Sequence, residues 1–193
     1  MKPSLSTICN AVIRYLNENL PEYYTYHNSQ HTLYVYEKAQ YIAEKEKVNT
    51  TDLTLVKIAA LYHDIGFTKS HIAHEKIGCA MATKQLKAYG FSEVEINTIC
   101  GMIMATKIPQ NPKTLLEQIL ADADLEYLAT ANYPSISQAL YQELLHFNPN
   151  LSETEWHNIQ IAFIKNHNYH TAYCKRYKTF RKNKNLARLE ATR

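Results

Sequence analysis

Apolar side chains recur at helical spacing along almost the whole chain, and no stretch alternates convincingly between apolar and polar residues. Four glycines and six prolines are few for 193 residues. Both features favour helices joined by short loops, so the sequence predicts an all-α helical bundle. A chain of this length most simply forms one domain, here residues 1–193, with a single substantial core. No internal repeat or interdomain linker divides it.

Local signals set the expected helix boundaries. Asn28 is a good N-cap residue, and the pairs Ser92 with Glu95 and Ser152 with Glu155 have the spacing of capping boxes. The segments expected to be helical are about 5–16, 28–47, 52–64, 71–90, 94–107, 114–129, 135–146 and 152–190. The last of these is predicted to be one long basic helix.

Cysteine usage and hydropathy predict a soluble, cytoplasmic protein with no membrane partner. The N-terminal segment has no signal-like apolar core, and no run reaches the roughly 20 apolar residues that a membrane span needs. No two cysteines form a CxxC pair that would suggest a zinc ribbon or a redox site. We expect reduced, mostly packed thiols at Cys9, Cys79, Cys100 and Cys174.

The net charge of +3 conceals an asymmetry. The stretch from Tyr173 onward carries eight of the 21 Lys and Arg residues but only one of the 18 acids, Glu190. Such a segment could contact nucleic acid or another phosphate-bearing partner. It could equally be the solvated face of a last helix whose aromatic residues Tyr173, Tyr177 and Phe180 dock on the body. We favour the second interpretation, because no segment resembles a nucleic-acid-binding module.

The segment 52–64 is apolar almost all round and therefore predicts a buried central helix, which ends in the pair His63-Asp64. Charge in an apolar setting is costly unless it is paired or bound to a metal. Adjacent helical side chains point about 100° apart, so they can hold one ion only where the helix ends. Gly66 supplies the expected bend. The alternative is a helix-end histidine beside a capping aspartate.

A second unusual carboxylate lies in the expected helix 114–129. Asp124 falls on a stripe that is otherwise apolar, so its side chain should face the core and need a cation. Asp122 falls on a polar stripe, where we expect it to face solvent or to support the site from outside.

The segment YHNSQH places His27 and His31 one helical turn apart at the expected start of a helix. The simplest interpretation is that both histidines lie on the surface of an amphipathic helix. However, His31 shares a face with Tyr34 and Val35 and should point inward. Together with His63, Asp64 and Asp124 it would complete a set of two histidines and two aspartates. Mixed nitrogen and carboxylate ligands suit a divalent ion such as Mn, Fe, Zn or Ni.

The order His31, His63-Asp64 and Asp124 on an all-α chain resembles the HD-domain metal-dependent phosphohydrolase superfamily. The resemblance covers about residues 26–128, the expected metal-site core. The segment YHNSQH is also similar to the signature of the cyclic-nucleotide phosphodiesterases, although HDIGF lacks the further histidine of that branch. The resemblance implies one tightly held divalent ion, with Mg added to the metals above, bound by His31, His63, Asp64 and Asp124.

The resemblance also implies catalytic roles. His27 would give a proton to the leaving group, and Asp64 would be the carboxylate that bridges two ions in two-metal members. A divalent ion lowers the pKa of its water from 15.7 to about 7, and a histidine with a pKa near 6.5 suits proton donation.

A second, weaker metal or phosphate position follows from the same resemblance. His74 and His71 are the candidate histidines after the HD pair, with His74 expected to point inward and His71 to lie nearer the rim. Thr106 stands near the place where two-metal members often have a histidine, so a complete second ligand set is not expected. Lys69 and Lys107 flank the expected site and could reach a substrate phosphate.

The sequence thus predicts a phosphohydrolase that cleaves a phosphoester of a small phosphorylated molecule, most simply a nucleotide, with metal-activated water. One alternative is a di-iron oxygenase of the HD type, and another is a regulatory module that binds metal or nucleotide without turnover. Substrate identity, the native metal and the oligomeric state stay open.

Overall fold

The computed structural model describes residues 2–192, and within this range it contains helices and no strand. The predicted all-α fold is therefore confirmed. The α-helices are α1 Leu5–Asn19, α2 Ser29–Lys45, α3 Thr50–Tyr62, α4 His74–Ala88, α5 Glu93–Ala105, α6 Leu115–Asp124, α7 Tyr133–Phe147, α8 Glu153–Asn166, α9 Ala172–Tyr177 and α10 Thr179–Ala191. Two short 3₁₀ helices are η1 Ile65–Thr68 and η2 Glu126–Ala129. Among the described helices, none has both the length and the apolar character of a membrane span.

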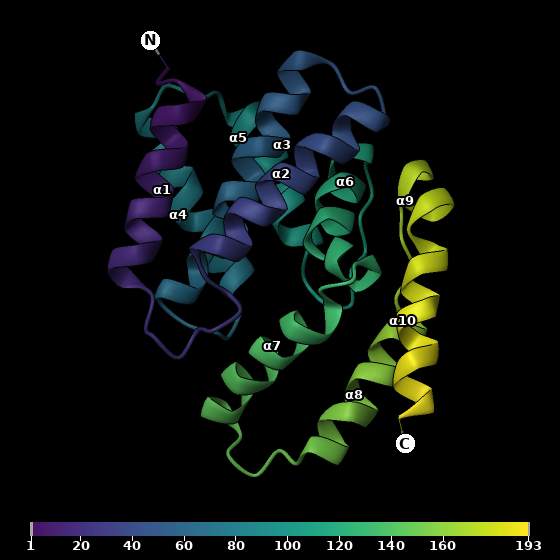
Figure 1. The fold of residues 1–193 in the computed structure, drawn as a ribbon. Coiled ribbons are helices and arrows are strands. Elements are labelled where there is room, and N and C mark those ends of the chain that lie inside the picture. Colours follow the sequence, from purple (N-terminus) through teal and green to yellow (C-terminus); the bar gives the residue numbers. More distant parts are fainter. Residues whose placement is uncertain (1, 193) are drawn as a thin grey trace.

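Helices α1 to α6 form one body around α3, and α7 and α8 extend from it as an antiparallel pair (Figure 1). The second half of α3 is buried apart from Lys57, with Ile58, Ala59 and Leu61 at 0% exposure. This agrees with the prediction of a central helix that is apolar almost all round. Helix α10 runs back along α8 and ends near the tip of the pair (Figure 1).

The predicted helix starts are confirmed at three positions. The Asn28 side chain accepts the backbone N–H groups of Gln30 and His31 at the start of α2. Ser92 and Ser152 each form a complete capping box, at α5 and α8 respectively. These starts depend on hydrogen bonds within a few residues, which is why a sequence pattern can locate them.

The single helix expected over 152–190 is wrong, because the structure has α8, α9 and α10 there. Between α8 and α9 the backbone becomes extended at His167, and Thr171 caps α9. The carboxylate of Asp122 holds this connection. It accepts the N–H groups of His170 and Thr171, each at 2.8 Å, and the Thr171 hydroxyl at 2.7 Å. Asp122 is 0% exposed, so the expectation that it faces solvent is also wrong.

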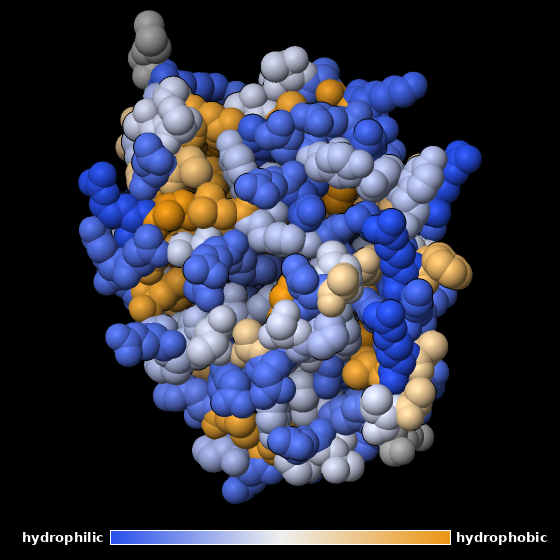
Figure 2. Space-filling model, viewed as in Figure 1, coloured by the Kyte–Doolittle hydropathy of each residue, from blue (hydrophilic) through white to orange (hydrophobic). Residues whose placement is uncertain are grey.

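The basic C-terminal segment exposes aromatic side chains as well as charged ones. Tyr177 and Phe180 are 53% and 77% exposed, so they do not dock on the body as expected. Tyr173 does pack inward, with its ring 5.6 Å from that of Tyr41. The ammonium of buried Lys182 donates to two backbone carbonyls at the end of α8, which fastens α10 to that helix. The rest of α10 presents a hydrophilic stripe to solvent (Figure 2).

Gly66 brings η1 against the start of α4. A Cβ atom at this position would lie only 2.0 Å from the carbonyl oxygen of His74, and the neighbouring backbone could not yield to it. Gly66 is therefore required by close backbone approach rather than as a left-handed helix stop. The backbone of Ala73, in contrast, is left-handed with φ 55° and directs the chain into α4. These two residues fix the position of His74.

Candidate metal centre

Three helix ends meet at the base of a cavity, and each contributes to a cluster of histidine and aspartate side chains. His31 lies in the first turn of α2, His63 caps the C-terminal end of α3, and Asp124 is the last residue of α6. His31 and His63 are buried, with 8% and 1% exposure. Asp64 follows His63 where the helix gives way to η1. Helix ends allow successive side chains to converge, as the sequence analysis required of His63 and Asp64.

The facing atoms of this cluster are close and nearly equidistant. His31 Nε2 lies 3.4 Å from His63 Nε2, 3.2 Å from Asp124 Oδ1 and 3.5 Å from Asp64 Oδ2. His63 Nε2 lies 3.0 Å from the same Asp64 oxygen and 3.6 Å from Asp124 Oδ1. Ligands at about 2.0–2.2 Å from one divalent ion are separated by about 3.0–3.5 Å when they occupy adjacent coordination positions. The spacing therefore fits a single bound cation.

Two further observations favour a cation at this place. Asp64 Oδ2 is buried and accepts no hydrogen bond among the described residues, which is costly for a carboxylate oxygen unless a cation faces it. His63 Nδ1 lies 2.8 Å from the carbonyl oxygen of Ala60. Because a carbonyl can only accept, Nδ1 carries a proton, so Nε2 is the nitrogen that would give its lone pair to a bound cation. This is how metal-binding histidines are usually oriented.

The charges of the cluster depend on one another. Burial lowers the pKa of His63, but the carboxylates of Asp64 and Asp124 outweigh it and hold that pKa well above its ordinary value. Burial raises the pKa of Asp124, but hydrogen bonds from His31 and His63 bring it down to about 2. The carboxylates thus retain a proton on His63 when no cation is bound. Binding a divalent ion would release that proton, so metal affinity should increase with pH.

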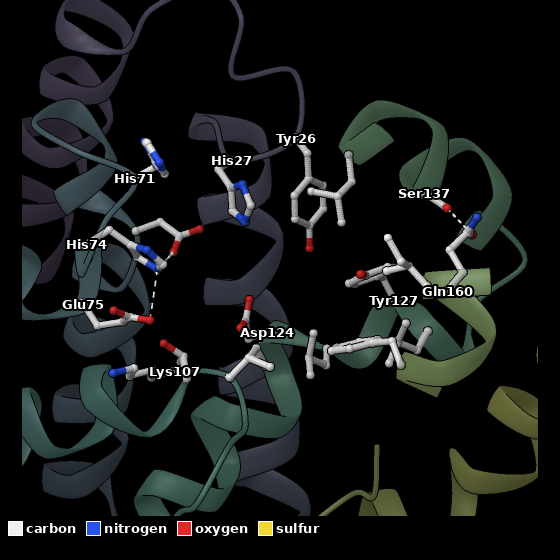
Figure 3. Close-up of a pocket in the computed structure, with 18 of the residues that line it drawn as sticks. Tyr26, His27, His71, His74, Glu75, Lys107, Asp124, Tyr127, Ser137 and Gln160 are labelled. Atoms are coloured by element: carbon white, nitrogen blue, oxygen red, sulfur yellow. Dashed lines mark hydrogen bonds and ion pairs between the residues drawn. The ribbon is translucent and has the colours of Figure 1, made fainter. Parts of the chain in front are cut away.

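A second, looser position lies on the other side of Asp64. Its Oδ1 faces His74 Nε2 at 3.7 Å, and Glu75 Oε1 lies 3.6 Å from the same nitrogen. Figure 3 shows His74 and Glu75 beside the cavity, across from Asp124. Thr106 is buried, lines the cavity and donates its hydroxyl to the Ile103 carbonyl. The tight group among the described residues is His31, His63 and Asp124, so the second position has fewer close ligands.

We expect His74→Ala to remove a weak second metal without disturbing the first. Calorimetric titration of the metal-free protein with Mn²⁺ should give two unequal sites, of which the weaker is lost in the variant. His71→Ala is the matched control and should keep both, because its ring lies at the mouth of the cavity against Phe147, with 4.3 Å between centroids. Two equally tight sites, or loss of the tight site in His74→Ala, would contradict this assignment.

His27 stands on the wall of the cavity and is braced by a glutamate. Its Nδ1 is hydrogen-bonded to Glu143 Oε1. The other oxygen of Glu143 accepts the backbone N–H groups of Tyr26 at 3.0 Å and of His27 at 2.9 Å. The ring of Phe67 lies between His27 and His74, with centroids 4.3 and 3.9 Å away. These contacts fix the orientation of His27 and leave its Nε2 available (Figure 3).

Glu143 was missed by the sequence analysis, although a signal was present. It lies on the stripe of α7 that also carries Ile136, Leu140 and Phe147, and it is 2% exposed. An acid on an apolar stripe needs a partner, as Asp124 does. Burial lowers the pKa of His27, but its hydrogen bond to Glu143 and the nearby carboxylates raise it above its ordinary value.

The remaining predicted residues divide into two groups. Lys107 and His71 line the cavity, whereas Lys69 is exposed and does not. The four predicted ligands are brought together, and His27 lies beside them. Their roles as ligands and as a proton donor stay predictions.

Comparisons with known proteins agree with this picture. A family model described as the HD domain matches residues 28–126. The crystal structure of a predicted HD superfamily hydrolase from an uncultured Thermotogales bacterium is 23% identical over 81% of this chain and 88% of its own, with a TM-score of 0.56. Bacillus subtilis YpgQ, solved in complex with ADP, is 16% identical over 98% of this chain and 94% of its own, with a TM-score of 0.67. At these identities the likeness is one of fold. No curated protein matches the sequence.

Proposed function

The chain belongs to the HD-domain family, and from that premise we propose that it is a metal-dependent phosphohydrolase acting on a small phosphorylated molecule. The observation that carries the proposal is the convergence of His31, His63, Asp64 and Asp124 at the base of a cavity beside a braced histidine. The cavity has a volume of about 570 Å³, which suits a nucleotide-sized substrate. The ADP bound to YpgQ is a further reason to test nucleotides first.

Different residues of the chain would have different roles in the hydrolysis of a phosphoester. A divalent ion held by the cluster would polarise the phosphoryl oxygens and lower the pKa of a bound water to about 7. Asp64 presents one oxygen to the cluster and the other toward His74, so it would hold an ion at either position and bridge the two where both are bound. His27 carries the proton that the departing alkoxide needs. Glu143 accepts the other ring proton, on Nδ1, which fixes the ring and helps to keep His27 protonated. Lys107, at the cavity wall, offers a positive charge to the incoming phosphate.

The proposal is tested by measuring the metal content of the purified protein and screening phosphorylated metabolites for phosphate release. We expect one divalent ion per chain and hydrolysis that a chelator abolishes and added metal restores. If the metal-loaded protein released phosphate from none of these phosphoesters, the result would favour the alternative of a regulatory module without turnover. Anaerobic reconstitution with iron and a spectroscopic search for paired irons tests the oxygenase alternative. That chemistry needs a further histidine ligand near the position that Thr106 occupies.

We expect Glu143→Gln to lose activity at high pH, because the upper pH limit of activity should move to a lower value. The glutamate raises the pKa of His27, so the acid form of His27 persists to higher pH. The glutamine can still accept the two backbone N–H groups but no longer carries the charge, and the pKa of His27 should fall. The alkaline limb of the kcat–pH profile then moves to lower pH, while metal content stays constant.

The matched control for this experiment is Glu37→Gln, because Glu37 is exposed on α2 away from the cavity. Its pH profile should coincide with that of the unmodified protein. An unchanged alkaline limb in Glu143→Gln would mean that His27 is not the group whose protonation governs turnover.

A further inference from the structure

The acidic and basic residues of the cavity lie at one end of it. Every Asp, Glu, Lys and His that lines the cavity comes from the segment 27–124. The segment 125–163, which includes η2, α7 and α8, contributes only uncharged lining residues. Figure 3 shows this division, with His27, His74 and Glu75 on one side and Tyr127 and Gln160 on the other. A phosphate and its metal have charged partners at the first end and none at the second.

The uncharged end has aromatic walls, which we call the aromatic chamber and define by Tyr127, Tyr133, Trp156 and Phe163. Two of its hydroxyl groups already have a partner. The hydroxyl of Tyr133 lies 2.6 Å from Gln160 Oε1, and the Ser137 hydroxyl donates to the same oxygen. A charged group placed here would lose its hydration without gaining a counter-charge. The chamber therefore favours an uncharged, flat occupant that presents its faces to aromatic rings.

Large apolar side chains are also exposed along the lining of the cavity. Ile72, Ile108 and Ile159 are 70%, 50% and 48% exposed, and they come from three different segments. Exposed apolar side chains that gather at one cavity are typical of a ligand-binding surface. A ligand with an apolar portion would cover them.

We propose that the aromatic chamber binds an uncharged aromatic ring carried by the leaving group of the substrate. The substrate class is then a phosphate monoester of an alcohol that bears such a ring, as in a nucleoside monophosphate, in preference to a simple sugar phosphate. This specificity rests on the proposed function, because the phosphate must occupy the charged end. Residues of α7 and α8, which lie beyond the segment matched by the family model, determine it.

Trp156 provides a direct test, because it is the single tryptophan of the chain and it lines the chamber. Adenosine, which has the ring but no phosphate, should change its fluorescence saturably in the metal-free protein. Ribose 5-phosphate, which has the phosphate but no aromatic ring, should not. This measurement requires no turnover. Binding of adenosine without hydrolysis of any phosphoester would support the chamber and count against the proposed function alone.

A matched pair of variants tests the same inference through kinetics. Phe163→Ala should lower the ratio of kcat/KM for adenosine monophosphate over ribose 5-phosphate by about tenfold, since stacking on one ring is lost. Phe180→Ala, the same change at an exposed ring on α10, should leave the ratio unaltered. Ile159→Ser should lower the ratio too, and because Ile159 is half-exposed the fold should tolerate the change. The proposal would be overturned if adenosine gave no fluorescence response, or if the ratio were unchanged in both Phe163→Ala and Ile159→Ser. This holds even if hydrolysis itself is found.

Discussion

Replacing His63 with alanine should remove the tightly held divalent ion and all measurable phosphoester hydrolysis together. His63 Nε2 lies within 3.0–3.6 Å of facing atoms of His31, Asp64 and Asp124, so the substitution opens the centre of the cluster. Loss of a single electrostatic stabiliser in an active site costs about 10²–10³ in rate, and loss of the whole ion should exceed about 10³. Metal analysis of the purified variant and phosphate release at saturating substrate measure the two effects.

A pair of substitutions on one helix supplies the control. Asp124→Asn should lose the ion, because Asp124 faces His31 at 3.2 Å. Asp122→Asn makes the same change two residues earlier, where the carboxylate binds His170 and Thr171 instead. It should keep the ion, at some cost in stability. The assignment of ligands would fail if Asp122→Asn lost the ion while Asp124→Asn retained it.

Replacing His27 with asparagine should slow the chemical step by about 10²–10⁴, the usual contribution of one positioned general acid. The ion should remain, because the tight group is formed by His31, His63 and Asp124. The defect should be largest for a nucleoside or sugar ester, whose alkoxide needs a proton to depart. It should nearly vanish for p-nitrophenyl phosphate, whose leaving group needs little protonation.

His71→Asn serves as the comparison, since it alters another histidine of the same cavity that lies against Phe147. Any effect it has should be equal for the two esters. If His27→Asn also slowed both esters equally at full metal occupancy, the histidine would be a structural residue rather than a proton donor.

Much of the fold could be predicted because its signals are local. Asn28, Ser92 and Ser152 each start a helix through hydrogen bonds to residues two or three positions away. The stripe that turns Asp124 inward is likewise a property of one helix. His31 and the pair His63-Asp64 could be proposed for the same reason, since each lies at an expected helix end.

What the sequence analysis missed depends on contacts between distant residues. Glu143 reaches His27 across 116 positions, and nothing near either residue indicates the other. The break between α8 and α9 arises where Asp122 binds the backbone at Thr171, 49 positions away. Tyr177 and Phe180 were expected to dock, but an amphipathic pattern cannot tell which side of a short helix meets the body.

The anchor at Asp122 limits how this protein could be shortened or grafted. The segment 28–126 contains the four predicted ligands, yet its last helix carries a buried carboxylate whose hydrogen-bond donors come from residues 170 and 171. A fragment that ended before α9 would leave the Asp122 carboxylate without these donors, and a hydrogen bond to a charged group typically contributes about 1.5–3 kcal/mol. The affected turn of α6 also holds Asp124. The segment with the predicted ligands therefore depends on the C-terminal segment, and we expect a transplant of the site to need both.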